Sequence, residues 1–330
     1  MTAASAHVAR LGAIEQIAAR TPASFFAVAL GVAGLGGDWR AASELWGLPS
    51  FVGEAIMAAA VLVWLMIAAL YAGKWIVARD AALTEWRHPV QCCFIALGPV
   101  ATMLVALAVR PYNDVVARVL FAVGAVSQVG FAVWRTGGLW DGGRDPLATT
   151  PVLYLPTVAG SLVLGTVAGT LGHTTLAALA LGAGFFSWLA LESIILHRLL
   201  VHEPLSPALL PTLGIQLAPP TVGCVAYLGI TRGPPDLFAL ALLGYGLLQA
   251  GVLLRIAARL RTQPFTLGFW AFSFGVTALA QGAIRVVARG AVELEVLSIA
   301  LFTVANIVIA ALALRTLLQV SRGRLLPPAS

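Results

Sequence analysis

The feature of this sequence that most constrains its fold is a series of apolar runs, each roughly 18–25 residues long, which as helices cross a hydrocarbon core of about 30 Å. Of its 330 residues, 60% are hydrophobic and only 10% are charged. A soluble domain is about 45–50% apolar and about 25% charged. Because too little polar surface remains to coat a soluble globule of this size, we predict an all-α integral membrane protein.

Charged residues, glycines and prolines divide the apolar runs into ten predicted transmembrane helices. No linker between them is long enough to hold a separate domain. We therefore expect a cytoplasmic N-terminal segment over residues 1–21, a single transmembrane domain over residues 22–319 and a cytoplasmic tail over residues 320–330. The predicted spans are 22–37, 50–73, 88–109, 113–135, 150–170, 174–200, 207–230, 235–260, 265–289 and 294–319.

The basic residues predict the orientation of the chain in the membrane. Most of the 20 Lys and Arg residues fall on the side of the predicted spans that also holds both termini. Cytoplasmic loops of membrane proteins carry such an excess of Lys and Arg, so both termini are predicted to be cytoplasmic. The net charge of +6 is then explained by orientation, and we do not expect the chain to bind nucleic acid.

The odd-numbered spans differ from the even-numbered spans in their prolines. Each odd span starts at or just after a proline, and most carry a further proline or glycine deeper in, whereas the even spans have no interior proline. An interior proline bends a helix and frees a carbonyl, which in hydrocarbon must be buried in protein or face a watery cavity. The helix-weakening residues are Gly31, Pro99, Pro156, Pro219 with Pro220, and Gly275.

This segregation predicts five helical hairpins around a central pore, with the odd helices inside and the even helices facing lipid. The alternative is that prolines and glycines are simply common in membrane helices. An anion is able to cross such a pore without a buried lysine, because broken helices expose N–H groups and positive dipole ends to the cavity.

Ionisable residues within the spans are scarce. We expect Glu54 and Arg285 to be paired or to reach the membrane surface, and Glu192 to brace the cytoplasmic end near His197 and Arg198. No row of acidic residues crosses the membrane, which argues against a cation channel and weakly against a proton relay. No P-loop, nucleophile elbow, zinc motif or pair of facing haem ligands occurs, so we expect no enzyme activity and no metal or other cofactor.

One apolar residue is a candidate gate. Phe274 lies about nine residues past the start of the ninth span, which at about 1.5 Å per residue places it roughly 14 Å deep, near the midplane. A phenyl ring there on a central helix plugs a narrow pore. The alternative, a packed core phenylalanine, is favoured by spacing alone.

The segment 269–275, Phe-Trp-Ala-Phe-Ser-Phe-Gly, and four other segments resemble the tellurite-resistance/dicarboxylate transporter family. That family includes bacterial TehA, fungal malate and sulfite carriers, and the slow anion channels of plant guard cells. The order and spacing of the segments carry the resemblance over nearly the whole chain. The other four segments are 88–99, 149–159, 214–219 and 244–255.

The resemblance implies a homotrimer in which the odd helices of each subunit line a separate pore. It also implies that Phe274 occludes this pore and that a small residue of the first helix packs against the ring. The family pattern F-G-x-x-L-G runs here from Phe26 to Gly31, with Ala27 in place of the first glycine. The added methyl group is therefore expected to press on the ring.

The expected function is an anion channel or uniporter in the cytoplasmic (inner) membrane of a bacterium. Its expected partners are small inorganic or organic anions, the lipid bilayer and further copies of the chain in a homotrimer. The alternative within the same fold is a proton-coupled carrier of four-carbon dicarboxylates, or an exporter of tellurite or sulfite. A membrane enzyme or redox protein would need ligand or catalytic residues clustered at one depth, and the sequence has none.

Overall fold

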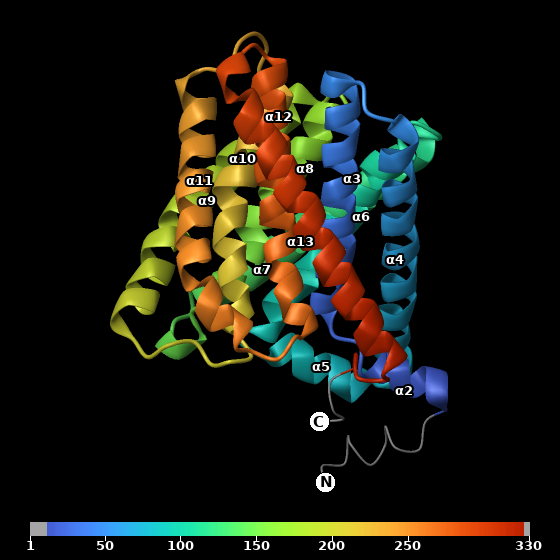
Figure 1. Cartoon of the computed structure of the whole chain (residues 1–330). Coiled ribbons are helices and arrows are strands. Elements are labelled where there is room, and N and C mark those ends of the chain that lie inside the picture. The colour runs from blue at the N-terminus through green and yellow to red at the C-terminus, as the bar shows by residue number, and fades with distance from the viewer. Residues whose placement is uncertain (1–11, 327–330) are drawn as a thin grey trace.

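The computed structural model describes residues 12–326 as a bundle of helices, with no strand in that part of the chain (Figure 1). Nine segments of it are long and apolar enough to cross a membrane, which confirms the all-α membrane class. They are Ser50–Val77 (α4), Gln91–Val109 (η2 and α6), Asp114–Leu139 (α7), Pro151–Thr170 (η4, η5 and α8), Thr174–Val201 (α9), Leu210–Ile230 (η6 and α10), Leu237–Arg261 (α11), Leu267–Ala288 (η7 and α12) and Val292–Ser321 (η8 and α13).

The first predicted span corresponds to η1 (Ala23–Phe25) and α3 (Phe26–Trp46). α3 is not among the nine apolar segments, yet it packs against α4, α6 and α12 within the bundle (Figure 1). The sequence-based end at residue 37 is wrong, because the helix continues to Trp46 and ends at Gly47, whose φ of 68° is left-handed. The continuation brings Asp38 into the protein interior, where it is fully buried.

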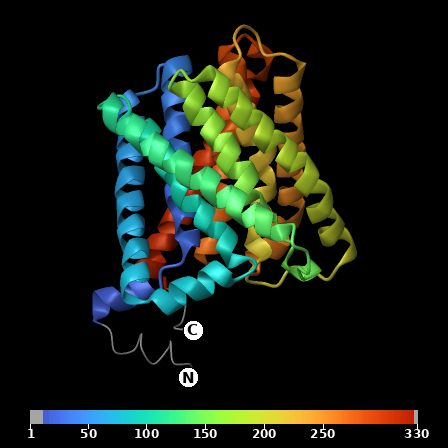
Figure 2. The same cartoon turned by 180° about the vertical axis from the view of Figure 1, so that it is seen from behind.

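The bundle consists of five hairpins whose first members form a closed ring. Each inner helix contacts the helix that follows it in sequence, and the inner helices contact one another in the order α3, α6, α8, α10, α12 and back to α3. Figure 2 shows α7 and α9 crossing obliquely over the outside of this ring. Within the ring, the α-helical parts are α6 (Leu97–Val109), α8 (Gly160–Thr170), α10 (Ala218–Ile230) and α12 (Ser273–Ala288).

Burial separates the two sets of helices. In the most apolar stretch of each segment, 61–83% of the residues are buried in the odd spans from Gln91–Val109 onward, but only 17–28% in the even spans. The prediction of inner odd helices and outer even helices is therefore confirmed. The exposed residues of the even helices are largely aliphatic, as a surface in contact with lipid requires.

Every inner span begins with a turn that is not α-helical. A 3₁₀ segment opens four of the spans, and in the fifth a 3₁₀ turn (η4) is followed by a π-helical segment at Pro156. The change to α-helix comes just before Pro99, Pro219 and Gly275. At Pro99 and Pro219 this placement agrees with proline's preference for a first helical turn, where its missing N–H is not needed. The opening segments are η1 (Ala23–Phe25), η2 (Gln91–Ala96), η4 (Pro151–Leu153), η5 (Leu155–Ala159), η6 (Leu210–Leu217) and η7 (Leu267–Phe272).

An outer helix supplies a hydrogen bond to the π-helical segment. Gln128 of α7 is buried, and its Nε2 donates to the carbonyl oxygen of Pro156 at 2.7 Å. Gly160 makes room for this side chain, because a Cβ there would lie 1.9 Å from Nε2. An irregular backbone segment inside the membrane is thus satisfied by protein, as hydrocarbon requires.

The end of the bundle at which the inner spans begin also holds two short helices, α2 (Ala13–Ala19) and α5 (Arg79–Arg87) (Figure 1). Glu85 of α5 accepts hydrogen bonds from Lys74 Nζ at 2.6 Å and from the Ala23 amide at 2.8 Å. Arg20 donates to the carbonyl oxygen of Leu326 at 3.3 Å, so the two ends of the described chain meet here. Residues 1–11 of the predicted N-terminal segment and residues 327–330 of the tail lie outside the described residues.

At the opposite end, a salt bridge joins the two helices of the first hairpin, and hydrogen bonds connect it to the second hairpin. Arg40 contacts Glu54 with a closest N–O distance of 2.8 Å and also donates to the carbonyl oxygen of Leu107. The Tyr112 hydroxyl donates to the same carboxylate at 2.7 Å. The expectation that Glu54 is paired is therefore confirmed.

Candidate pore

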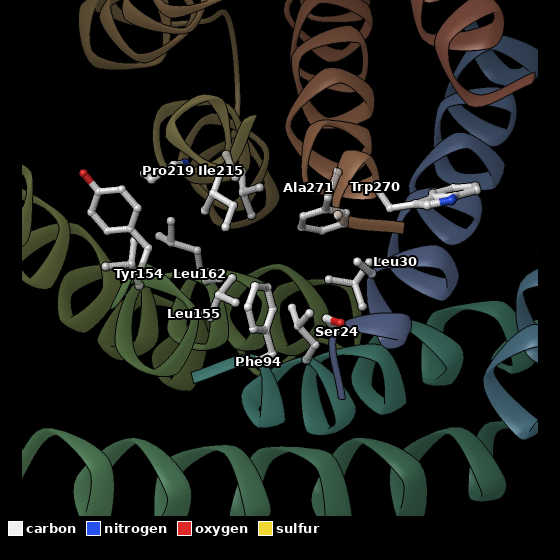
Figure 3. A pocket seen from close by; sticks show the side chains of 18 of the residues that line it. Ser24, Leu30, Phe94, Tyr154, Leu155, Leu162, Ile215, Pro219, Trp270 and Ala271 are labelled. Atoms are coloured by element: carbon white, nitrogen blue, oxygen red, sulfur yellow. The ribbon is translucent and has the colours of Figure 1, made fainter. Parts of the chain in front are cut away.

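Two cavities lie on the axis of the inner ring. The first lies among the opening turns of the inner spans, and residues of all five inner spans line it (Figure 3). Its walls are apolar apart from Ser24, because the hydroxyl of Tyr154 points away from the cavity (Figure 3). The lining residues used below are Ala27, Phe94, Pro219, Val222 and Phe274.

The second cavity lies farther along the same helices. Its lining includes the glycines Gly34 and Gly37 of α3 and the side chains of Thr277, Gln281 and Arg285 of α12. Apart from Met57 of α4, every residue that lines it comes from an inner helix. Its wall is therefore more polar than that of the first cavity.

Phe274 and Val222 line both cavities, and no other described residue does. Phe274 is the second residue of α12, directly after the 3₁₀ turn η7, and its side chain is half-buried. Gly34 of α3 faces the ring, because a Cβ placed on it would lie 3.5 Å from Cδ2 of Phe274. The aromatic ring thus stands at the partition between the two cavities.

The other predicted pore and kink residues divide into two groups. Ala27 and Pro219 line the first cavity together with Phe274. Phe26 is buried and packs edge-on against Tyr71, with ring centroids 6.0 Å apart. Phe26, Gly31, Pro99, Pro156 and Gly275 are not among the residues that line either cavity.

Glycines bring the first inner helix close to the last. A Cβ on Gly31 would lie 2.3 Å from Ser273 Oγ, and one on Gly34 would lie 2.2 Å from Thr277 Oγ1. A Cβ on Gly37 would lie 2.6 Å from Gln281 Nε2. Gly34 and Gly37 were missed by the sequence-based reasoning, although their spacing of three from Gly31 places all three on neighbouring turns of one helix.

Broken helices were expected to expose backbone N–H donors to the pore, and three of the junctions do not expose the N–H of the residue at the junction. At three of the junctions between the opening turns and the α-helices, the N–H groups of Leu97, Ala218 and Ser273 each bond to a preceding carbonyl oxygen. The inner spans therefore continue through these junctions without a free helix N-terminus.

Glu192 is held by a network that connects inner and outer helices. Its carboxylate accepts hydrogen bonds from the Tyr154 hydroxyl, from Trp188 Nε1 at 2.8 Å and from the Tyr245 hydroxyl at 3.0 Å. Glu192 was expected to act as a brace near His197 and Arg198, and the partners that it contacts are Tyr154, Trp188 and Tyr245. The carboxylate joins α9 to α11 and to the residue that precedes η5.

Replacing Tyr245 by phenylalanine removes one donor from this half-buried carboxylate. We expect a loss of about 1 kcal/mol in stability, the usual size of such a bond in a membrane protein. Tyr112→Phe is the matched control. It also removes a hydroxyl that donates to a glutamate carboxylate, but Tyr112 is 71% exposed. Thermal unfolding in detergent measures both variants, and equal midpoints would contradict a structural role for the network.

Arg285 lies on the wall of the second cavity. Of the two expectations for Arg285, a pair or a side chain that reaches the membrane surface, the pair is not found: residues 12–326 show no ion pair or hydrogen bond of Arg285. Arg289, one turn later, donates instead to Thr231 Oγ1 at 3.1 Å and to the Thr231 carbonyl oxygen at 2.9 Å. Sequence reasoning also missed Asp38, because it placed this residue in a loop.

Comparisons with known proteins match one family and several relatives over much of the chain. The family described as SLAC1, voltage-dependent anion channel, matches residues 20–317. The chain is 34% identical to a tellurite resistance protein TehA homolog of Haemophilus influenzae over 92% of both chains. It is 26% identical to an uncharacterized transporter of Methanocaldococcus jannaschii over 61% of this chain and 65% of that protein. It is 22% identical to the S-type anion channel SLAH3 of Arabidopsis thaliana over 91% of this chain and 48% of the plant protein.

Proposed function

The chain belongs to the SLAC1 family of voltage-dependent anion channels, and from that premise we propose that it passes small anions through a pore in its own helix bundle. One observation carries the proposal: two cavities lie along the inner ring, and Phe274 with Val222 stands between them. The anions move down their electrochemical gradient, and no chemical step takes place.

The gate of this proposed pore is the phenyl ring of Phe274. An anion enters the first cavity, whose walls are mainly apolar, and stops at the ring. A narrow hydrophobic constriction blocks ions because water leaves it and the ion loses its hydration shell. When the ring turns aside, the two cavities join and the anion reaches the more polar walls of the second cavity.

The experiment that tests anion passage is a reversal potential. The purified chain is placed in a planar bilayer with a tenfold chloride or nitrate gradient. The measured potential is expected to lie near the equilibrium potential of the anion. A reversal potential near that of the cation, or currents no larger than those of protein-free bilayers, would overturn the proposal.

We also propose the assembly and placement that the sequence predicts: a homotrimer in a bacterial inner membrane, with both termini cytoplasmic. The exposed aliphatic residues of the outer helices support it, since such surfaces contact lipid or another subunit. The detergent-solubilised protein is expected to have a mass of about three times 34.3 kDa after subtraction of bound detergent. Light scattering combined with size exclusion measures this mass, and a monomeric value would contradict the trimer.

A proton-coupled carrier of dicarboxylates, or an exporter of tellurite or sulfite, is the second candidate. Asp38 favours it, because this carboxyl is fully buried and neither of its oxygens has a hydrogen-bond partner among the described residues. A buried acid within a membrane bundle is a common element of proton pathways. Malate uptake into liposomes at clamped voltage distinguishes the two: a pH gradient drives a carrier and Asp38→Asn abolishes the effect, whereas flux through a channel follows voltage alone.

A further inference from the structure

The second cavity contains a cation that no described residue neutralises by direct contact. Arg285 lines its wall on α12, and residues 12–326 offer it neither a hydrogen bond nor a salt bridge. At about 1.5 Å per residue, Arg285 lies roughly 16 Å along the helix from Phe274. Within a membrane bundle an unpaired guanidinium is costly, so its retention calls for a ligand or a partner.

Hydrogen-bond acceptors are available to a guanidinium in this part of the fold, as the neighbouring Arg289 shows. Arg289 has its guanidinium occupied by Thr231 and by the carbonyl oxygen of Leu228. These acceptors lie in the last turn of α10 and at the residue that follows it, and Arg289 is the residue that follows α12. Arg285 keeps its donors free on the side of the cavity.

A second free donor lies one turn before Arg285. Gln281 also lines the cavity, and no hydrogen bond of its amide occurs among the described residues. The absence of a side chain on Gly37 leaves room for this amide, because a Cβ there would lie 2.6 Å from Nε2. The spacing of four places Gln281 and Arg285 on one face of α12, where both reach the same ligand.

The acidic residues near Arg285 act at longer range. Glu44 and Asp38 interact with its charge through space, and neither forms a salt bridge with it. No acidic residue lines the second cavity within the described part of the chain. The cavity therefore presents donors and positive charge, while the acids of α3 reduce the field and keep an anion from being held too tightly, which conduction requires.

We propose that Arg285 and Gln281 form a binding site for one small inorganic anion, such as chloride, nitrate or bromide, in the second cavity. The inference rests on the proposed function in that the bound ion is the permeating one. The site gives the pore its preference for anions, a property that the apolar first cavity and the bonded backbone N–H groups do not provide.

Bromide is the probe that locates the site without a transport assay. Crystals of the full-length chain are soaked in sodium bromide, and anomalous diffraction identifies the ion. We expect a peak beside the Arg285 guanidinium in the wild type and in Arg285→Lys, and no such peak in Arg285→Gln. Arg289→Gln is the matched control and keeps the peak. A wild-type crystal without bromide beside Arg285, or an Arg285→Gln crystal that keeps it, overturns the site.

Conductance supplies the second test. In a Phe274→Ala background, Arg285→Gln is expected to raise the chloride concentration for half-maximal current about tenfold, through loss of a charge-assisted hydrogen bond. The site is contradicted if the chloride concentration for half-maximal current is unchanged in a variant that elutes as a single peak on size exclusion. That result would leave the proposed function intact. Bromide beside Arg285 in a protein that passes no anion supports the site and overturns the function.

Discussion

Phe274→Ala is expected to increase the anion current at least tenfold over the wild type. The ring stands between two cavities that only it and Val222 share among the described residues, so its removal joins them into one passage. A tenfold change in rate corresponds to a barrier change of only about 1.4 kcal/mol, and the loss of a phenyl ring from a constriction exceeds this. Currents at equal protein density in planar bilayers measure the effect.

Phe94→Ala is the control for this experiment. Phe94 is an aromatic residue of the inner ring that lines the first cavity but not the second. The same loss of volume there widens the entrance without joining the cavities, so the current is expected to stay near the wild-type value. If Phe274→Ala folds as the wild type does and conducts no more, the ring is not the gate.

Gly31→Ala is expected to destabilise the bundle by about 1–3 kcal/mol, the usual cost of adding a methyl group to a packed core. The new Cβ would lie 2.3 Å from Ser273 Oγ, 2.5 Å from Ser273 Cβ and 2.9 Å from Trp270 Cε3. Ser273 is fully buried and donates to the Trp270 carbonyl oxygen at 2.6 Å, so it has little freedom to move away. α3 and α12 must separate, and the partition at Phe274 is expected to loosen.

The measurement is the thermal midpoint and the yield of monodisperse protein in detergent. Gly130→Ala is the matched control, because Gly130 is a helical glycine of α7 and a Cβ added there would meet no atom within 4 Å. That substitution is expected to be neutral or to stabilise the helix by about 0.5–1 kcal/mol. Equal midpoints for the two variants would falsify the close contact between α3 and α12.

The inner and outer helices were predictable from the sequence because the signal is local. Proline restricts its own φ and lacks an N–H wherever it stands, so the alternation of prolines marks the spans that need protein around them. The end of α3 was not predictable in the same way. Asp38 and Arg40 interrupt the apolar run, yet the helix continues past them, and Arg40 is paired there with Glu54 and bonded to the carbonyl oxygen of Leu107.

Within the candidate pore, the sequence identified Phe274 and the family resemblance assigned its role, but the contacts of the polar residues were not predicted. Glu192 was expected to brace one end of the bundle, and its partners Tyr154 and Tyr245 come from other spans. Arg285 was expected to be paired or to reach the membrane surface, and the cavity that it lines was not expected. Such contacts join residues far apart in the chain, and local patterns do not encode them.

Run length and proline position are properties of single segments, so they are sufficient to predict that this chain crosses a membrane many times and that alternate helices lie inside. Which side chains face the axis could be learned only from the packed helices. That choice depends on the rotation of each helix against its neighbours, which Gly31, Gly34 and Gly37 set by letting α3 approach α12. The same close contact leaves Phe274 between two cavities and Arg285 on the wall of the second.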